Sequence, residues 1–274
     1  MQGNYRRLIK GKNRAVFQLF ELISEAPKYE LWTDNKSYIM MQSNENTPIW
    51  IWLDEKISDN IQAKYHIVDI MKERISKNPN VHFNAVPDSF STVIPYLENE
   101  VNKKVATVMQ MNVYVWKSSP IINKKGNMIP ANDKYAVEMQ KLLIQLVKDG
   151  EHEDMPMETA KQVVDSMIAS QNVFLWKDEG EICSMAMIAH RGEHFTRINT
   201  VVTDRSKRGK GYAGMLVSEM CRNEQQNGNE IMLYADADNP ASNRLYQRIG
   251  FEQVGQIAEY KMEKEISYIK GRQV

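Results

Sequence analysis

A basic, glycine-containing loop between a strand and a helix constrains this chain most. Residues 199–214 read N-T-V-V-T-D-R-S-K-R-G-K-G-Y-A-G. The β-branched run from Thr200 to Thr203 favours a strand. Apolar residues return at helical spacing from Met215 onward, which predicts a helix over residues 209–226. The sequence therefore predicts a strand, a short backbone loop and a helix N-terminus in direct succession.

This arrangement suits a phosphate-bearing ligand. A helix N-terminus offers unpaired N–H groups and the positive end of the helix dipole. Gly209 and Gly211 remove the Cβ where a ligand would approach the backbone. The basic side chains beside them are Arg205, Lys207, Arg208 and Lys210. The nucleotide patterns G-x₄-G-K-[ST] and G-x-G-x-x-G are absent. On the loop alone, a pyrophosphate site and a solvated basic turn both remain open.

A second motif follows at residues 238–251, which read D-N-P-A-S-N-R-L-Y-Q-R-I-G-F. Asn239 is a suitable N-cap, and the proline after it suits the first helical position. Asn243 and Tyr246 lie three residues apart and share one face of the predicted helix. Gly250 is placed to end that helix, and Phe251 to pack back beneath it.

The segment 117–133 contains two prolines and a Gly-Asn turn and predicts a surface linker. We place an N-terminal α/β domain at residues 1–118, a linker at 119–132 and a second domain at 133–274. The second domain is expected to hold helices at 134–148, 159–170, 209–226 and 239–249, and strands at 172–177, 181–190, 195–203, 231–235 and 256–263. This order, ααβββαβαβ, predicts a mixed sheet with helices on its faces.

The first part ends in a similar order. Helices are expected at 14–23, 61–75 and 90–98, and strands at 37–42, 49–53, 81–85 and 105–115. The closing βαβαβ repeats the end of the second part, although no sequence repeat is visible. We therefore expect a degenerate copy of the second fold.

Together the two motifs resemble the GNAT superfamily of acyl-CoA N-acyltransferases. The matching segments are V-V-T-D-R-S-K-R-G-K-G-Y-A and N-P-A-S-N-R-L-Y-Q-R-I-G-F, in the right order. The likeness extends from about residue 133 to 263, and it is similar to a bacterial "predicted acetyltransferase" branch with an extra N-terminal half. It implies an α/β GNAT fold in the C-terminal half and a degenerate GNAT-like N-terminal half without a CoA loop. Asp204 stands where that branch often has proline.

The resemblance implies acetyl-CoA as cosubstrate and assigns it contacts. Backbone N–H groups of residues 208–213 would bind the pyrophosphate, and strand 201–203 would pair with the pantetheine arm. Asn239 and Asn243 would contact that arm or stabilise the splayed strands. The residues implied are Val201, Val202, Thr203, Arg208, Gly209, Lys210, Gly211, Tyr212, Ala213, Asn239, Asn243 and Tyr246. Acetyl and other short acyl groups remain open.

The implied reaction is direct attack of an amine on the thioester in a ternary complex. Tyr246 matches the position that protonates the CoA thiolate in many members, and the alternative is that it only packs. No residue is identified as the base. The candidates are His190, Glu193 and His194, or a water chain. The acidic loop of Glu151, His152, Glu153 and Asp154 would attract a cationic amine, or would be solvated charge.

Composition excludes several classes. Lys+Arg and Asp+Glu both number 35, so the net charge is zero, which argues against a broad nucleic-acid binder. The sequence contains no run of about 20 apolar residues, so it predicts no membrane span. A cytoplasmic location is expected. Cys183 and Cys221 are expected to be reduced and buried, and no metal-ligand pattern occurs.

The sequence thus favours an N-acetyltransferase acting on a small-molecule or peptide amine. Two alternatives remain open, a non-catalytic acyl-CoA-binding regulatory module and an interaction protein that docks through its first half. A homodimer is also left open.

Overall fold

The computed structural model describes residues 5–118, 125–150, 154–226 and 228–263. The chain forms two compact units. Unit 1 comprises Met1–Asn112, Asp236–Asp238 and Gly255–Val274, and unit 2 comprises Val113–Ala235 and Asn239–Val254. These limits differ from the sequence-based division because strands β5 (Val105–Trp116) and β11 (Phe251–Met262) each pass from one unit into the other.

Apart from β6, unit 2 has the element order that the sequence predicted, but the last strand, expected at 256–263, is β11, which begins at Phe251 and continues into unit 1. Its further elements are β6 (Asn127–Pro130), η3 (Asp133–Tyr135), α6 (Ala136–Gly150), α7 (Met157–Ala169), β7 (Val173–Asp178), β8 (Glu181–Arg191), β9 (Phe195–Thr203), η4 (Arg205–Lys207), α8 (Tyr212–Gln225), β10 (Glu230–Asp236) and α9 (Pro240–Arg248). Its strands follow the order β5-β10-β9-β8-β7-β6. The β9–β10 pair is parallel, whereas β6–β7, β7–β8 and β8–β9 are antiparallel.

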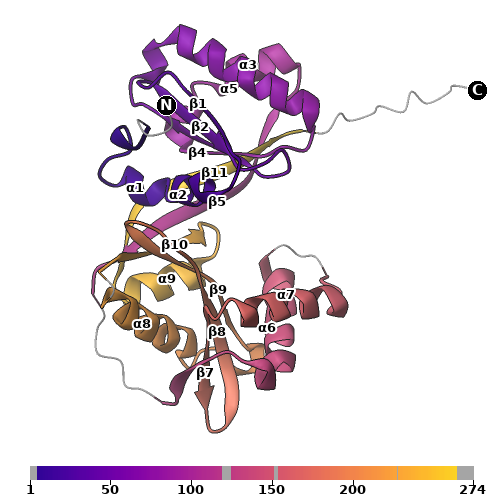
Figure 1. The fold of residues 1–274 in the computed structure, drawn as a ribbon, viewed down its shortest axis with the longest axis vertical. Helices are drawn as coiled ribbons and strands as arrows, with labels where there is room; N and C mark the ends of the chain where they lie inside the picture. The colour runs from indigo at the N-terminus through magenta and orange to yellow at the C-terminus, as the bar shows by residue number, and fades with distance from the viewer. Residues whose placement is uncertain (1–4, 119–124, 151–153, 227, 264–274) are drawn as a thin grey trace, which may run out of the picture. The chain divides into compact units, whose positions relative to one another are not determined.

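Helices cover both faces of this sheet (Figure 1). Leu216 and Met220 of α8 pack with Ile198 and Leu233 on one face, where α9 also lies. Helices α6 and α7 cover the other face, and Val202 of β9 belongs to that second core. The expected mixed sheet with helices on its faces is therefore confirmed.

Strand β6 lies inside the segment expected to be a linker. It pairs with the edge of β7, where Met128 opposes Trp176. The Trp176 indole also donates to the Lys125 carbonyl at 2.8 Å. Proline at position 130 is compatible with this because an edge strand leaves one row of N–H groups unused. Residues 119–124 of the expected linker lie outside the described residues.

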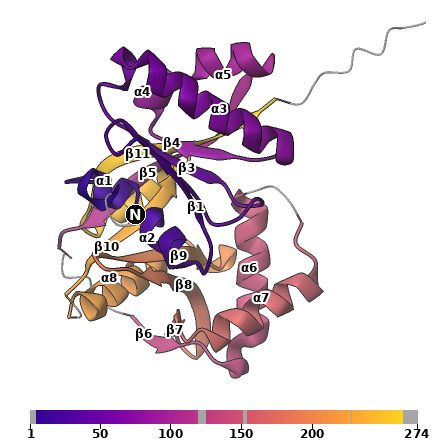
Figure 2. The same cartoon turned by 45° about the horizontal axis from the view of Figure 1, so that its top comes forward.

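Unit 1 is a mixed sheet with its main helices on one face (Figure 2). Its further elements are η1 (Tyr5–Arg7), α1 (Asn13–Val16), α2 (Leu19–Glu25), β1 (Glu30–Thr33), β2 (Tyr38–Gln42), β3 (Ile49–Leu53), η2 (Ile57–Asp59), α3 (Ile61–Lys77), β4 (Phe83–Ala85), α4 (Pro87–Phe90) and α5 (Ile94–Val101). Its strand order is β1-β2-β3-β4-β11-β5. The crossover β3–α3–β4 joins parallel strands, as β9–α8–β10 does in unit 2.

Three expectations for the first part need correction. The helix expected at 14–23 is two short helices, α1 and α2, and the helix expected at 90–98 is α4 followed by α5. Strand β1 was not predicted. It is held by a contact far along the chain, because the Arg74 guanidinium of α3 binds Glu30 and lies 4.6 Å from the Trp32 ring centroid.

Candidate active site

The loop after β9 is shaped by two left-handed glycines. Gly209 has φ +81° and Gly211 has φ +83°, so α8 begins at Tyr212 and not at the expected residue 209. A Cβ added to either glycine would meet no atom of the described residues within 4 Å, apart from the adjacent residues in the chain. These glycines are therefore required by the backbone conformation, and the space beside them is open.

The N-terminus of α8 is left without a side-chain cap. Gly211 occupies the N-cap position and has no side chain with which to accept the first amides of the helix. The amide groups of the first turn, from Tyr212 to Gly214, have no carbonyl partner within the helix. Donors of this kind, with the helix dipole behind them, suit an anionic ligand.

Asp204 closes the turn that leads into the loop. Its Oδ1 accepts the Ser206 amide at 2.8 Å and the Ser206 hydroxyl at 2.6 Å. The Ser206 hydrogen bonds lower the pKa of the Asp204 carboxyl. A local hydrogen-bonded turn thus stands where the branch that this sequence resembles often has proline.

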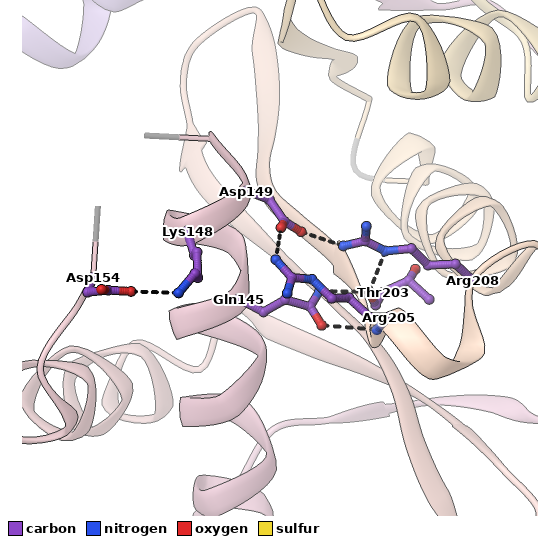
Figure 3. A network of polar contacts seen from close by, with 7 residues as sticks. All are labelled: Gln145, Lys148, Asp149, Asp154, Thr203, Arg205 and Arg208. Atoms are coloured by element: carbon purple, nitrogen blue, oxygen red, sulfur yellow. Dashed lines mark hydrogen bonds and ion pairs between the residues drawn. The ribbon is translucent and has the colours of Figure 1, made fainter. Parts of the chain in front are cut away.

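Helix α6 is bonded to this loop through its last turn (Figure 3). Asp149 forms ion pairs with Arg205 and with Arg208, the latter at 2.5 Å. Gln145 donates to the Thr203 carbonyl and accepts the Arg205 amide, both at 3.0 Å. Two of the expected phosphate-facing cations are therefore bound to a carboxylate of α6.

The other two basic residues differ from each other. Lys207 is directed toward β8, where its Nζ donates to the Ile182 carbonyl at 2.8 Å and pairs with Glu181 at 2.9 Å. Lys210 is exposed. The expectation that four cations converge on one place is corrected, because partners on α6 and β8 hold three of them.

Asp149→Asn is expected to lower the free energy of unfolding by about 1 kcal/mol at neutral pH, since two partly exposed ion pairs are lost. Hydrogen bonds from Arg205 and Arg208 lower the pKa of Asp149 below its ordinary 3.8. A lowered carboxyl pKa stabilises the folded state above the unfolded value, and that contribution disappears as the pH falls through the native value. Urea unfolding at pH 7 and pH 3 should show the difference from wild type shrinking at pH 3.

The matched control is Asp154→Asn, because among the described residues Asp154 pairs with Lys148 alone, at 2.9 Å, from a strongly exposed position. It should change the unfolding free energy by a few tenths of a kcal/mol at most. Equal losses in the two variants, or a pH-independent loss in Asp149→Asn, would contradict the account of the α6 contacts.

Strand β9 leaves its partner β10 soon after its start. The parallel register joins Phe195–Arg197 to Glu230–Met232 and ends there within these two fully described strands. A register shift follows on the other side, where Met185 opposes Val202 but Met187 opposes Asn199. Thr200, inside this bulge, has φ +54°, a rare conformation for a β-branched residue. The edge of β9 toward β10 is thus open over its C-terminal half.

The side chains of Val201, Val202 and Thr203 are mainly packed or bonded. Val201 packs on the core beneath α8, and Val202 is 5% exposed in the core beneath α6. The Val202 carbonyl accepts the Ser184 hydroxyl at 2.6 Å, and the Thr203 carbonyl accepts Gln145. A ligand could use only the remaining backbone groups of this strand.

Tyr212 and Gly214 serve the structure of α8. The Tyr212 hydroxyl donates to Asp178 at the end of β7, at 2.7 Å, and this bond raises the pKa of the phenol. A Cβ on Gly214 would lie 3.1 Å from Leu245 of α9. Ala213 is half-buried between them in the first turn. Gly214 is therefore small because α9 packs closely on α8.

Helix α9 begins and is held as its sequence predicted. The Asn239 carboxamide accepts the Ser242 amide at 3.1 Å, which makes Asn239 the N-cap. Asn243 accepts the Tyr114 hydroxyl at 2.9 Å and donates to the Asn239 carbonyl at 2.7 Å. These contacts connect α9 to β5, so both asparagines have structural partners.

Tyr246 is a buried residue, 7% exposed, on the inner face of α9. Its ring lies 6.1 Å from the Tyr114 ring and 5.8 Å from the Phe251 ring. Among the described residues, its hydroxyl has no hydrogen-bond partner. Burial raises the pKa of the phenol. Tyr246 is therefore a protonated phenol whose O–H is left for another partner.

The candidate bases lie at the other end of β9. His190 lies opposite Arg197 in the β8–β9 register, and the turn after it returns the chain to Phe195. The His194 carbonyl accepts the Glu230 amide at 3.1 Å, in the closed part of the β9–β10 pair. Glu193 belongs to the same turn. Of the acidic loop, Glu151, His152 and Glu153 lie outside the described residues, and Asp154 is paired with Lys148.

Several residues of this region were not found from the sequence. Four residues lie in no recognisable motif, and each bonds to a segment that is distant in sequence. They are Asp149, Gln145, Asp178 and Tyr114. Both cysteines are buried and unpaired, as expected. Among the described residues, no group of His, Cys, Asp or Glu could hold a metal ion. No helix in the described part is long and apolar enough to cross a membrane.

Comparisons with known proteins agree with this architecture. Residues 178–260 match the family model of FR47-like proteins. A GCN5-related N-acetyltransferase from Kribbella flavida superposes with a TM-score of 0.60 at 9% identity, covering 92% of this chain and 95% of that one. A GNAT-family acetyltransferase from Colwellia psychrerythraea gives a TM-score of 0.55 at 10% identity, covering 91% and 96%. No curated protein matches this chain.

A third structure, a GCN5-related N-acetyltransferase from Sphaerobacter thermophilus, has a TM-score of 0.57 and 14% identity, covering 83% of this chain and 81% of that one. These identities are low, so the likeness concerns the fold. The fold is that of the GNAT superfamily, which the two sequence motifs indicated.

Proposed function

We propose that this protein is an N-acetyltransferase that transfers an acetyl group from acetyl-CoA to a primary amine of a small molecule or peptide. The observation that carries the proposal is the juxtaposition in unit 2 of an uncapped helix N-terminus with an open strand edge. The first lies behind Gly209 and Gly211, and the second is the C-terminal half of β9. Together they suit a ligand with a phosphate group at one end and an amide-bearing arm.

Acetyl-CoA has that chemistry. Its pyrophosphate would accept hydrogen bonds from the backbone N–H groups of residues 208–213, with Arg208 and Lys210 nearby. Its pantetheine arm, which carries two amides, would pair with the open edge of β9 as an added strand pairs with a sheet. The arm would then run from the loop toward the point at which β9 and β10 meet.

The proposed reaction needs no acyl-enzyme. The amine nitrogen attacks the thioester carbonyl, the C–S bond breaks, and CoA leaves as a thiolate. A backbone N–H near the bulge at Thr200 would stabilise the oxyanion. Tyr246 would give its phenolic proton to the thiolate, the amide product would lose its extra proton to solvent, and the Tyr246 phenolate would regain a proton from solvent. Holding the two reactants in line supplies much of the acceleration, about 7–11 kcal/mol in favourable cases.

We infer one acetyl-CoA site per chain. In unit 1 the corresponding crossover begins at α3, whose N-cap Asn60 accepts the Ala63 amide at 3.1 Å. The preceding turn, residues 54–60, contains no glycine. An N-terminal half of this kind fits a degenerate GNAT-like unit 1, whereas unit 2 carries the proposed acetyl-CoA site.

Gly211→Val is expected to weaken acetyl-CoA binding by about 10-fold or more. The branched side chain would fill the open space beside the loop, and a misplaced charge-assisted hydrogen bond costs about 1.5–3 kcal/mol. Gly180→Val is the matched control, since Gly180 has φ +87° and open space around it in the β7–β8 turn. Titration calorimetry should find normal affinity in the control.

Both variants should lose about 1–2 kcal/mol of stability, because valine is disfavoured at positive φ. Equal acetyl-CoA affinity in the two variants would place the cosubstrate elsewhere.

The activity itself is tested by thiol release and product mass over a panel of amines, polyamines, aminoglycosides, amino acids and peptides. We expect CoA release that depends on one class of amine, with a mass increase of one acetyl group. Saturable acetyl-CoA binding with no transfer to any amine would contradict the proposed enzyme and would favour a binding module.

A further inference from the structure

Arg197 lies on β9 at the last position that pairs with β10, opposite Met232. Its two neighbours in sequence face α8. Thr196 Oγ1 lies 3.4 Å from Glu224 of α8, and Ile198 is part of the core beneath that helix. Because side chains alternate along a strand, Arg197 faces the opposite side of the sheet. It therefore stands on the far face where β9 and β10 begin to separate.

The guanidinium of Arg197 has no hydrogen-bond or ion-pair partner among the described residues. The residue is half-buried, and its Nε is a buried donor with no hydrogen-bond acceptor. The two terminal nitrogens make no hydrogen bond to a described residue. Native proteins rarely leave a buried charged donor unsatisfied, because its desolvation is then uncompensated.

On the side of β10 and β5, this face contains little that could compensate the charge. Leu233 and Ala235 face the core beneath α8, so Met232 and Tyr234 share the face of Arg197. On the neighbouring strand β5, Val113 and Val115 lie on that face as well. Burial lowers the pKa of Arg197, against a smaller opposing effect of the Tyr234 phenol. Arginine nevertheless stays protonated at neutral pH.

The position of Arg197 relates it to the reacting group. A pantetheine arm that enters at the loop after β9 would place its thioester toward the junction of β9 and β10. Thr200, at the bulge, is three residues from Arg197, about 10 Å along a strand. One arginine side chain can span most of that distance. A group bound by Arg197 would therefore belong to a reactant at the thioester end of the site.

We propose that Arg197 binds a carboxylate carried by one of the two reactants, so that the enzyme acts on an anionic substrate. This inference rests on the proposed acetyl transfer. The amine acceptor is the first source of such a carboxylate, as in an amino acid or a peptide C-terminus, and a dicarboxylic acyl group is the second. Guanidinium is the side chain best suited to a planar carboxylate because it can form two parallel hydrogen bonds.

The test compares matched reactants in the full chain. The acceptor pair compares an α-amino acid with its carboxamide, each with acetyl-CoA as donor. The acyl pair compares succinyl-CoA with butyryl-CoA, each with the carboxamide as acceptor. We expect the wild type to prefer the carboxylate by about 10- to 100-fold in kcat/KM in one pair. Arg197→Met should abolish the preference and Arg197→Lys should keep part of it. Arg248→Met, which removes an exposed charge of α9, should keep all of it.

A second readout needs no turnover. Calorimetry compares an N-acetyl amino acid with its carboxamide, and succinyl-CoA with butyryl-CoA, so that a failure of acetyl transfer itself remains distinguishable. Equal affinities within both pairs, or a preference that Arg197→Met retains, would overturn the proposal. The melting temperature of ligand-free Arg197→Met should equal or exceed that of wild type, because an unpaired buried charge is removed. A markedly lower melting temperature would assign Arg197 a structural role instead.

Discussion

Tyr246→Phe is expected to lower kcat for acetyl transfer by about 100-fold while leaving acetyl-CoA affinity and stability close to wild type. A positioned general acid typically contributes about 10²–10⁴-fold. Phenylalanine keeps the ring contacts with Tyr114 and Phe251. The hydroxyl that it removes has no partner among the described residues, so no protein hydrogen bond is lost. The measurement is steady-state thiol release with the preferred amine.

The pKa of Tyr246 sets how kcat should depend on pH. Burial raises the pKa of Tyr246 above the ordinary 10.0, so the phenol stays protonated across the neutral range. Loss of the acid on deprotonation should therefore not reduce kcat between pH 7 and pH 10. Tyr260→Phe is the matched control, since Tyr260 is a buried tyrosine of unit 1 whose pKa is raised to about 12, again by burial. Equal kcat values in Tyr246→Phe and wild type would reduce Tyr246 to a packing residue.

Gly250→Ala should be among the most destabilising single changes in the chain, with a loss of about 2–5 kcal/mol. Gly250 has φ +95°, which costs an L-residue about 1–2 kcal/mol. A Cβ there would overlap the Ser118 carbonyl oxygen, a backbone atom. Relieving that overlap requires the backbone to move, and overpacking of this kind costs about 1–3 kcal/mol.

The same backbone movement would break two hydrogen bonds near Gly250. The Gly250 carbonyl accepts the Lys117 amide at 2.9 Å, and the Ile249 carbonyl accepts the Trp116 indole at 3.1 Å. Urea unfolding should report the loss, with Gly180→Ala as the control for positive φ alone. A loss in Gly250→Ala no greater than in that control would show that the chain accommodates the side chain.

The sequence predicted most of the loop and of α9 because their determinants are local. Gly209, Gly211 and Gly250 fix left-handed backbone positions, and Asn239 caps the helix that follows it. The contacts to Gly250 and to Arg205 and Arg208 could not be predicted, because Ser118 and Asp149 are far from them in sequence. Helix α8 begins later than expected because helical spacing alone does not show where the left-handed turn ends.

Other features depend on the pairing of strands. The separation of β9 from β10, the bulge at Thr200 and the exposure of one strand edge arise from register, which no local pattern encodes. Strand β1 could not be predicted for a similar reason, because its Glu30 is held by Arg74, which is distant in sequence. Arg197 also could not be singled out, because its lack of a partner becomes visible only once the faces of β9 are known.

The central claim is that acetyl-CoA binds along β9 and at the start of α8, once per chain. Hydrogen exchange of backbone amides with and without saturating acetyl-CoA tests it most directly. The account predicts slower exchange in residues 201–203 and 208–214, with unchanged exchange at the start of α3, residues 57–63. Protection at the start of α3, or no protection at residues 208–214, would contradict it.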